Sequence, residues 1–329
     1  MSSRTTSSRA ISLKILRSLA AGLLVALAAC AHAQEGRFSF ATQAEARAIL
    51  GQHDDYVRAT GALERSALLR TREAIDAERL AKAMQETALE WTTEEKRAFG
   101  AALAPLERFI AGMKWKAPPQ IPIVKASGLL MDNSPHTRGN AIVLPEGMRR
   151  AALERPGLMD YLMAHEAFHV LSRADPALRE KLYGAIGFQA CASVDMPAPL
   201  AGLRVTNPDA PESRHAITVR RGGRSVEVLP FVHFPSEAID PGAGFIAQMQ
   251  TSWLLVDRRN GRCEVRGEGP ALAELEGLYE QVGRNTGYLI HPEEILADNF
   301  ALLFREAATP GVAKIRSPEI LERMRKILQ

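Results

Sequence analysis

The stretch Met163-Ala164-His165-Glu166-Ala167-Phe168-His169-Val170-Leu171 is an apolar run that contains two histidines and one glutamate. Pro156-Gly157 breaks the chain just before it, so we expect a helix at about residues 158–172. Residues four apart lie on nearly the same face of an α-helix, which lets both imidazoles reach one metal ion. Burying these polar groups without a partner would cost free energy. The stretch therefore predicts a buried helix that binds a metal.

The glutamate in this stretch has a different role from the histidines. Glu166 directly follows His165 and projects to the side of the metal-binding face. From there its carboxylate can hydrogen-bond a metal-bound water and act as a general base, while zinc lowers the pKa of that water and polarises a carbonyl. The pattern predicts Zn²⁺ as cofactor, His165 and His169 as ligands, and Glu166 as the base of a hydrolase.

A hydrolytic zinc site needs a third protein ligand, and one candidate lies close to the motif. Asp175 stands six residues after His169, where enzymes with the pattern H-E-x-x-H-x-x-G-x-x-H/D have their third ligand. Ser172 takes the place of the glycine at which that pattern turns sharply. Asp175 also suits the N-cap of a helix that begins at Pro176 and continues to about Ile186. Asp175 is therefore the weaker candidate.

The stronger candidate lies in Tyr288-Leu-Ile-His291-Pro292-Glu293-Glu294-Ile-Leu-Ala297-Asp298-Asn-Phe300. Pro292 suits a helix start, which places Glu294 in the first turn and Asp298 one turn later on the same face. An acidic first turn also favours the helix macrodipole, and this accounts for Glu293 well. The macrodipole does not account for the presence of Asp298 and Phe300 at their spacings from Glu294.

The spacing of Glu294, Ala297, Asp298 and Phe300 resembles the third-ligand helix of gluzincin metallopeptidases, in particular their anthrax-lethal-factor-like branch. This resemblance covers the two ligand helices only. It implies that Glu294 binds zinc and that Asp298 accepts a hydrogen bond from a ligating histidine. It also implies an oxyanion-stabilising tyrosine ahead of the glutamate, for which Tyr288 is the nearest match and His291 an alternative.

The remaining sequence predicts a single α+β domain in which helices dominate. Residues 30–118 read as an N-terminal helical portion, with helical spacing over 62–89 and a helix start at Thr92-Thr93-Glu94-Glu95. Residues 119–329 read as a zincin-like catalytic domain. Its expected elements are strands at 121–126 and 140–144, a strand-rich insertion at about 191–266, and helices at about 270–283, 292–306 and 317–328.

The N-terminus reads as an export signal. Residues 1–29 contain four of the 41 basic side chains, none of the 38 acidic ones, and an apolar run that is short for a bilayer span. Leu27-Ala28-Ala29-Cys30 resembles a bacterial lipobox, so we expect an envelope lipoprotein acylated at Cys30. The alternative is a soluble protein released after Ala33. The body is nearly neutral, with 37 basic and 38 acidic side chains, and gives no argument for nucleic-acid binding.

Several other residues have weaker interpretations. In an oxidising compartment Cys191 and Cys263 are free to pair, but two separate buried thiols fit equally well. His136-Thr137-Arg138 precedes an expected strand and is either a substrate-contacting loop or a solvated turn. The histidines away from the motif are expected to be surface or structural residues: His53, His215 and His233.

These features predict hydrolysis of peptide bonds in the cell envelope, with a peptide or protein as the partner. Two alternatives remain. The first is an amidase acting on cell-wall peptide, and the second is a non-catalytic lipoprotein with a structural zinc site. Glu166 argues against the second, because a structural site needs no base beside an open position.

Overall fold

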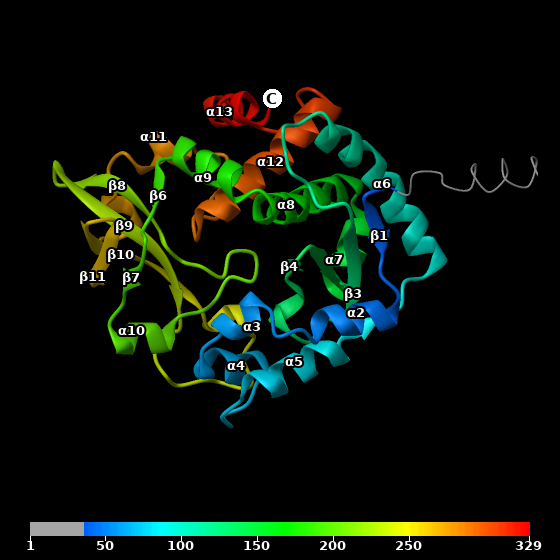
Figure 1. Cartoon of the computed structure of the whole chain (residues 1–329), viewed down its shortest axis with the longest axis horizontal. Helices are drawn as coiled ribbons and strands as arrows, with labels where there is room; N and C mark the ends of the chain where they lie inside the picture. Colours follow the sequence, from blue (N-terminus) through cyan, green and yellow to red (C-terminus); the bar gives the residue numbers. More distant parts are fainter. Residues whose placement is uncertain (1–35) are drawn as a thin grey trace, which may run out of the picture. The chain divides into compact units, whose positions relative to one another are not determined.

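The computed structural model describes residues 36–329, and Figure 1 shows how their elements are arranged. Residues 37–329 form one compact unit. The structure is 46% helical and 20% strand, so the predicted α+β class, in which helices dominate, is confirmed. The predicted signal segment, Cys30 and the cleavage position Ala33 lie outside the described residues. Within 36–329, no helix is both long and apolar enough to cross a membrane.

The first sheet has the strand order β1-β3-β5-β4, with β2 paired to β3. β3 runs parallel to β1 and β5, whereas β4 runs antiparallel to β5 at one edge. Both strands expected from the sequence are present, as β3 and β5. The strands are β1 (Phe38–Phe40), β2 (Ala88–Leu89), β3 (Ile121–Ala126), β4 (His136–Arg138) and β5 (Ala141–Pro145).

This sheet is buried on both faces, because successive side chains of a strand point to opposite sides. Ile123 and Ile142 belong to a core that they share with α8 (Pro156–Ala174). Val124 and Val143 belong to a second core, formed with the N-terminal helices. The sheet is therefore a middle layer, with α8 above it and the helices of residues 43–86 below it in Figure 1.

The N-terminal portion is helical, as predicted, but its helices are shorter than the periodicity indicates. The expected helix over 62–89 is interrupted at Arg70, whose φ is 51°, and resumes after Asp76, which caps the next helix by accepting from Arg79 N. Thr92 and Glu95 form the predicted helix start as a capping box. The helices are α2 (Gln43–Leu50), α3 (Asp55–Ala59), α4 (Ala62–Leu68), α5 (Ala77–Glu86) and α6 (Thr93–Ala111).

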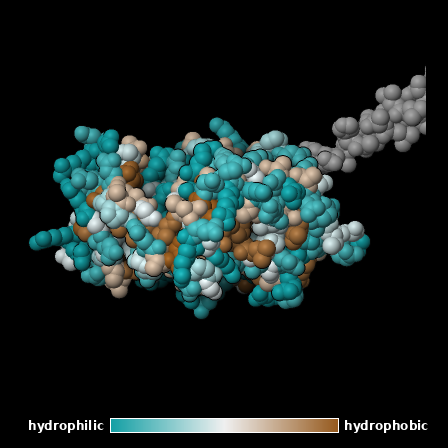
Figure 2. All heavy atoms as spheres, turned by 90° about the horizontal axis from the view of Figure 1, so that it is seen from below, coloured by the Kyte–Doolittle hydropathy of each residue, from teal (hydrophilic) through white to brown (hydrophobic). Residues whose placement is uncertain are grey.

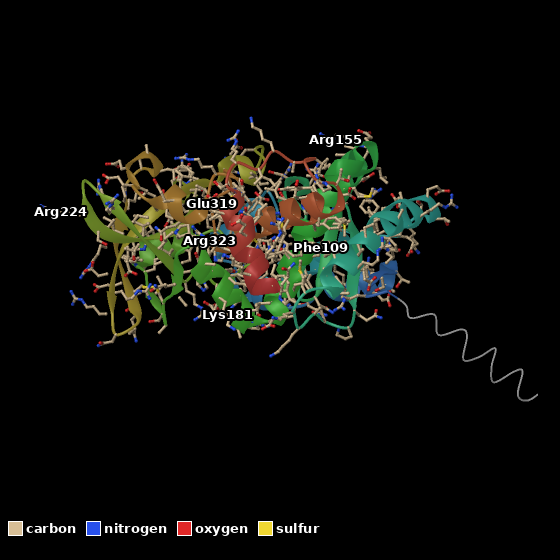
Figure 3. All side chains as sticks on the ribbon, turned by 90° about the horizontal axis from the view of Figure 1, so that it is seen from above. Phe109, Arg155, Lys181, Arg224, Glu319 and Arg323 are labelled. Atoms are coloured by element: carbon tan, nitrogen blue, oxygen red, sulfur yellow. A yellow bond between two sulfur atoms is a disulfide. The ribbon has the colours of Figure 1, made fainter. Side chains whose placement is uncertain are left out.

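Helix α8 packs against α12 in the main core, and the aromatic rings of Phe168 and Phe300 meet there with centroids 5.6 Å apart. In Figure 3, which looks at the molecule from above, α13, which bears Glu319 and Arg323, lies near the middle of the view. Arg323 donates to Ala185 O and Gln281 O, both at 3.2 Å, and so ties α13 to the elements beneath it. The other helices of this region are α7 (Glu146–Glu154), α9 (Pro176–Ala185), α12 (Pro292–Ala308) and α13 (Pro318–Leu328).

The predicted strand-rich insertion is the second sheet, with the order β6-β8-β9-β10-β11-β7. A hairpin at Asn260-Gly261, a dipeptide typical of tight β-turns, joins β10 to β11, and both turn residues have a positive φ, 51° and 78°. The elements are β6 (Phe188–Ala190), β7 (Val194–Asp195), α10 (Ala198–Leu203), β8 (His215–Arg221), β9 (Arg224–His233), β10 (Gln250–Arg259) and β11 (Arg262–Glu268).

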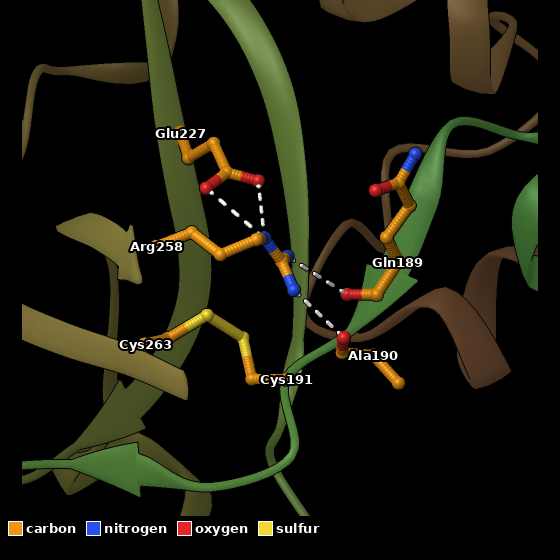
Figure 4. The surroundings of a disulfide bond; sticks show 6 residues. All are labelled: Gln189, Ala190, Cys191, Glu227, Arg258 and Cys263. Carbon is orange, nitrogen blue, oxygen red and sulfur yellow. Dashed lines mark hydrogen bonds and ion pairs between the residues drawn. A yellow bond between two sulfur atoms is a disulfide. The ribbon is translucent and has the colours of Figure 1, made fainter. Parts of the chain in front are cut away.

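A disulfide closes one face of this sheet, which resolves the question that the sequence left open. Cys191, just after β6, is bonded to Cys263 on β11, with Cα atoms 5.7 Å apart (Figure 4). Arg258 lies beside it, donating to Glu227 Oε1 at 2.9 Å and to Ala190 O at 2.8 Å. The ion pair and the disulfide together fasten the edge of the insertion to its central strands.

One predicted helix is wrong. Residues 270–283 contain only a 3₁₀ turn and the short α11 (Leu278–Val282). Gly277 adopts φ 81° directly before α11, and Gly283 adopts φ 76° directly after it, so left-handed backbone limits the helix at both ends. This segment instead pairs with the second sheet through a bridge between Glu276 and Arg220.

The face shown in Figure 2 is mainly hydrophilic, with hydrophobic side chains gathered toward its middle. Among the described residues, large apolar side chains are exposed at separate positions in the chain, including Leu129, Ile246 and Tyr288. Of these, only Tyr288 belongs to the segment predicted to carry chemistry. Scattered exposed apolar side chains are normal for a folded domain.

Candidate metal centre

The site is assembled where α8 crosses α12. The helical spacing of His165 and His169 directs both imidazoles from α8 toward the first turn of α12, where Glu294 lies. Pro292 occupies the first turn of α12, and His291 caps it by accepting from Glu293 N at 3.1 Å. The apolar packing of the two helices therefore fixes the distance between the histidines and the glutamate.

Three side-chain atoms converge in this crossing. His165 Nε2 lies 3.2 Å from Glu294 Oε2, and His169 Nε2 lies 3.7 Å from the same oxygen. One ligand atom from each of the three residues lies within 4.8 Å of the other two, which is close enough to hold one metal ion. The structure thus brings together the two histidines and the stronger of the two candidate third ligands.

The other ring nitrogen of His165 is held by Asp298, as the resemblance implied. His165 Nδ1 lies 2.9 Å from Asp298 Oδ1. Asp298 also accepts from Tyr161 Oη at 2.5 Å and from Thr286 Oγ1. These bonds fix the orientation of the imidazole and leave its Nε2 directed at Glu294.

His169 has a matching partner in Glu293, which the sequence analysis assigned only to the helix macrodipole. His169 Nδ1 lies 3.0 Å from Glu293 Oε1, and Glu293 Oε2 accepts from Ser172 Oγ at 2.7 Å and from Tyr183 Oη. Glu293 is 1% exposed, so it is not a residue of a solvated helix end. Neighbouring residues of a helix point about 100° apart, so the Glu293-Glu294 pair could have indicated two different partners.

The donor set fits a divalent cation. His169 is fully buried, and its Nε2 makes no hydrogen bond within the described chain. Burying such a nitrogen without a partner is unfavourable, whereas a metal ion would satisfy it. Burial by itself lowers the pKa of His169, but the carboxylates of Asp209 and Glu294 raise it to about 9. The surroundings therefore favour positive charge, and two imidazoles with one carboxylate are ligands that zinc accepts.

Glu166 lies beside this set rather than in it. It is 3% exposed, and its Oε2 has no hydrogen-bond partner within 36–329. Burial and the nearby Asp209 carboxylate raise the pKa of Glu166 to about 8. A buried carboxylate with an unused oxygen next to a cation site has the position and the proton affinity of a general base.

A segment that the sequence analysis did not single out covers the site. Asn207 donates from Nδ2 to Glu294 Oε1 at 2.7 Å. Asp209 offers a carboxylate oxygen that lies within 4.8 Å of ligand atoms of Glu166 and His169. Both come from the loop between α10 and β8 in the insertion, far from either ligand helix in sequence. No periodicity or motif marks them, because their position depends on how the insertion folds back.

Tyr288 lies at the rim of the site. It is 48% exposed and lines a cavity of about 80 Å³ together with Asn207 and Asp209. Its backbone N–H donates at 2.9 Å to Thr286 Oγ1, the hydroxyl that also bonds Asp298. Partial burial and the Glu294 and Asp209 carboxylates raise the pKa of the phenol, which therefore stays protonated and able to donate.

The alternative candidates have other positions. Asp175 caps α9 and accepts from Leu178 N at 3.2 Å, as its sequence context indicates. His291 is buried against Tyr183 and His215, and burial and His215 lower its pKa to about 3. Its Nδ1 is engaged in the helix cap.

The 136–138 segment is a buried edge strand, β4, rather than a loop or a solvated turn. The remaining histidines have structural partners: His53 with Glu78, His215 with Glu180, and His233 with Ser252.

Taken together, the crossing of α8 and α12 holds three converging donors, a carboxylate behind each histidine, a buried acid beside them, and a phenol at the rim. Such a set can bind a cation, orient a carbonyl group and transfer a proton. Comparison of the chain with protein-family models, with curated proteins and with solved structures gave no match.

Proposed function

We propose that this protein is a zinc-dependent peptidase with a zincin-like catalytic domain of the gluzincin type. The observation that carries the proposal is the convergence of His165, His169 and Glu294, with a second carboxylate behind each imidazole. Glu166 supports a catalytic rather than a structural site, because its free oxygen has no use in a closed four-ligand site.

When bound, a zinc ion would supply a Lewis acid that polarises the substrate carbonyl and lowers the pKa of water. Glu166 Oε2 would take a proton from the attacking water and transfer it to the nitrogen of the leaving amine. Tyr288 would donate a hydrogen bond to the carbonyl oxygen as negative charge develops on it. Asp298 and Glu293 would keep the two imidazoles in the ligating tautomer.

A peptide is the substrate class that the surroundings favour. β4 is an edge strand of the first sheet, and it contributes Thr137, whose side chain is fully buried and whose N–H points away from β5. An extended peptide can add to such an edge by backbone hydrogen bonds. The disulfide between Cys191 and Cys263 also supports the proposed export, since such bonds persist in oxidising compartments.

Two measurements test the proposal. Purified protein is expected to hold about one zinc per chain. Glu166→Gln should keep this zinc and lose hydrolysis of an unfolded protein such as casein by a factor of about 10² or more. If the wild type binds no zinc, or if Glu166→Gln hydrolyses casein at the wild-type rate, the proposal is wrong.

The amidase alternative is tested with the same two proteins. Release of amino groups from purified cell-wall peptide, with no cleavage of casein, would assign the site to that substrate. Equal zinc content in both proteins and no hydrolysis of either substrate would favour the structural zinc site.

A further inference from the structure

Asn207, Pro208 and Asp209, called here the 207–209 segment, lie across the proposed metal site. Asn207 donates to Glu294 Oε1, the oxygen that does not face the histidines. Asp209 offers a carboxylate oxygen within 4.8 Å of ligand atoms of His169 and Glu166. The segment therefore reaches Glu294 through Asn207 and the neighbourhood of His169 through Asp209.

Asp209 also accepts from the backbone N–H of Thr137 on β4, to which an added peptide strand would bond. Its Oδ1 accepts from Thr137 N at 2.6 Å and from Thr137 Oγ1 at 2.7 Å. Thr137 is the middle residue of β4 and pairs with Ile142 of β5 on its other side. The carboxylate of Asp209 thus takes the place of a substrate carbonyl at the edge of the sheet.

Two cavities meet at this segment. The larger, of about 390 Å³, is lined by Gly139 and Arg173, and the smaller, of about 80 Å³, by Ser134 and Tyr288. Pro208 and Asp209 line both cavities. Ser134 precedes β4 and Gly139 follows it, so the two cavities lie at opposite ends of the edge strand. Pro208 and Asp209 therefore separate two cavities that lie at the two ends of β4.

The segment is held at both ends by residues outside the site. Thr206 donates from N and from Oγ1 to the buried Glu64 carboxylate of α4, both at 2.9 Å. Arg173 of α8 donates to Asp209 O at 3.0 Å and also bonds Thr137 Oγ1 at 2.9 Å. These anchors keep the loop in its position independently of any metal.

We propose that Asp209 is a fourth metal ligand and that the 207–209 segment closes the groove along β4 in this form of the protein. The inference rests on the proposed function and adds a resting state to it. With Asp209 on the metal, the position needed for water and substrate carbonyl is taken, so the closed form is inactive. An extended peptide binds only after the segment has moved and the two cavities have joined.

The test compares Asp209→Asn with the wild type and with Asp195→Asn, an exposed aspartate of the same insertion that pairs with Arg262. The first readout is the rate at which a coloured chelator removes zinc, and the second is the rate of casein hydrolysis. Asp209→Asn should keep one zinc, release it at least about tenfold faster, and hydrolyse casein faster than the wild type. Asp195→Asn should behave like the wild type in both assays.

A second variant covers the case in which Asp209→Asn fails to fold. Arg173→Gln removes the anchor on Asp209 O and leaves every proposed ligand in place; it should also speed zinc release and hydrolysis. Wild-type rates of zinc release in both variants would overturn the inference. A wild type without zinc would instead contradict the proposed function, so the two failures are distinguishable.

Discussion

At the scale of single residues, His165 and His169 each direct one ring nitrogen toward Glu294 and give the other to a second carboxylate. The sequence motif predicts the two histidines and their helix, since both follow from spacing along one element. The partner of His165 was implied by the resemblance, but the partner of His169 was missed. A first-turn glutamate has two explanations, and only the crossing of α8 with α12 decides between them.

The role of Glu293 as the hydrogen-bond partner of His169 can be tested by mutation. Glu293→Gln should lower zinc affinity about 10- to 100-fold, because a neutral amide holds the imidazole tautomer less well than a carboxylate. The measurement is a competition titration with a fluorescent zinc chelator. Glu319→Gln, on the exposed face of α13, serves as the control and should leave affinity unchanged. Equal affinities of the two variants would mean that Glu293 only favours the helix macrodipole.

Glu64 predicts a pH dependence of stability. Burial raises its pKa to about 7 from the ordinary value of 4.5, so the folded state binds a proton more tightly than the unfolded chain. The associated stability is fully present below about pH 4.5 and is lost as pH rises to about 7. Glu64→Gln should remove about 3 kcal/mol of this pH dependence, since one pKa unit is about 1.4 kcal/mol.

This expectation is checked by urea denaturation at pH 4.5 and pH 8 with the wild type and Glu64→Gln. Glutamine keeps an oxygen for Thr206 N and an amide for Thr206 Oγ1, so the anchor of the 207–209 segment is retained. The free energy of unfolding could instead change between pH 4.5 and pH 8 by the same amount in the wild type and in Glu64→Gln. That result would show that Glu64 is charged throughout this range.

At the scale of elements, the strands at 121–126 and 140–144 and the helices at 158–172, 292–306 and 317–328 were predictable. Their hydrophobic period matches their structure, and caps or prolines mark their starts. The helix expected at 270–283 failed because Gly277 and Gly283 adopt positive φ, which a periodic pattern does not reveal. β4 was missed because three residues are too few to show a period, and its burial comes from the elements packed around it.

The disulfide sets the stability of the second sheet. Cys191 and Cys263 are separated by 72 residues, so their bond removes much of the entropy of a long loop from the unfolded chain. Replacing both cysteines by serine should lower the free energy of unfolding by about 4 kcal/mol. Thermal denaturation of the oxidised protein and the double variant measures the difference, with Cys191→Ser alone showing whether a free Cys263 adds a further effect. Equal melting temperatures would contradict this role.

At the scale of the whole molecule, the proposed metal site joins parts of the chain that are distant in sequence. His165 and Glu294 are supplied by α8 and α12, and the insertion between these helices returns Asn207 and Asp209 to the same place. The class of the fold and the two helices that carry His165, His169 and Glu294 could be predicted from local patterns. The position of Asn207 and Asp209 over the site could not be predicted, because it depends on how the second sheet packs against the other elements.

A bound ion should therefore stabilise the molecule as a unit. Zinc at 100 times its dissociation constant is expected to add about 2.7 kcal/mol to the free energy of unfolding, and a chelator should remove this gain. Glu294→Ala should respond to neither, because it lacks one of the three converging donors. Asp175→Ser keeps a capping side chain on α9 and should respond as the wild type does. A zinc response lost in Asp175→Ser and kept in Glu294→Ala would reverse the assignment of the third ligand.

The aromatic packing between the two ligand helices gives the molecule an optical probe of its own. The indole of Trp115 lies edge-on against both Phe168 of α8 and Phe300 of α12, with ring centroids 5.5 Å and 5.7 Å away. Any change in the separation of these helices alters the surroundings of that indole. Its fluorescence should therefore report any movement of α8 against α12, without a dye and without a substrate.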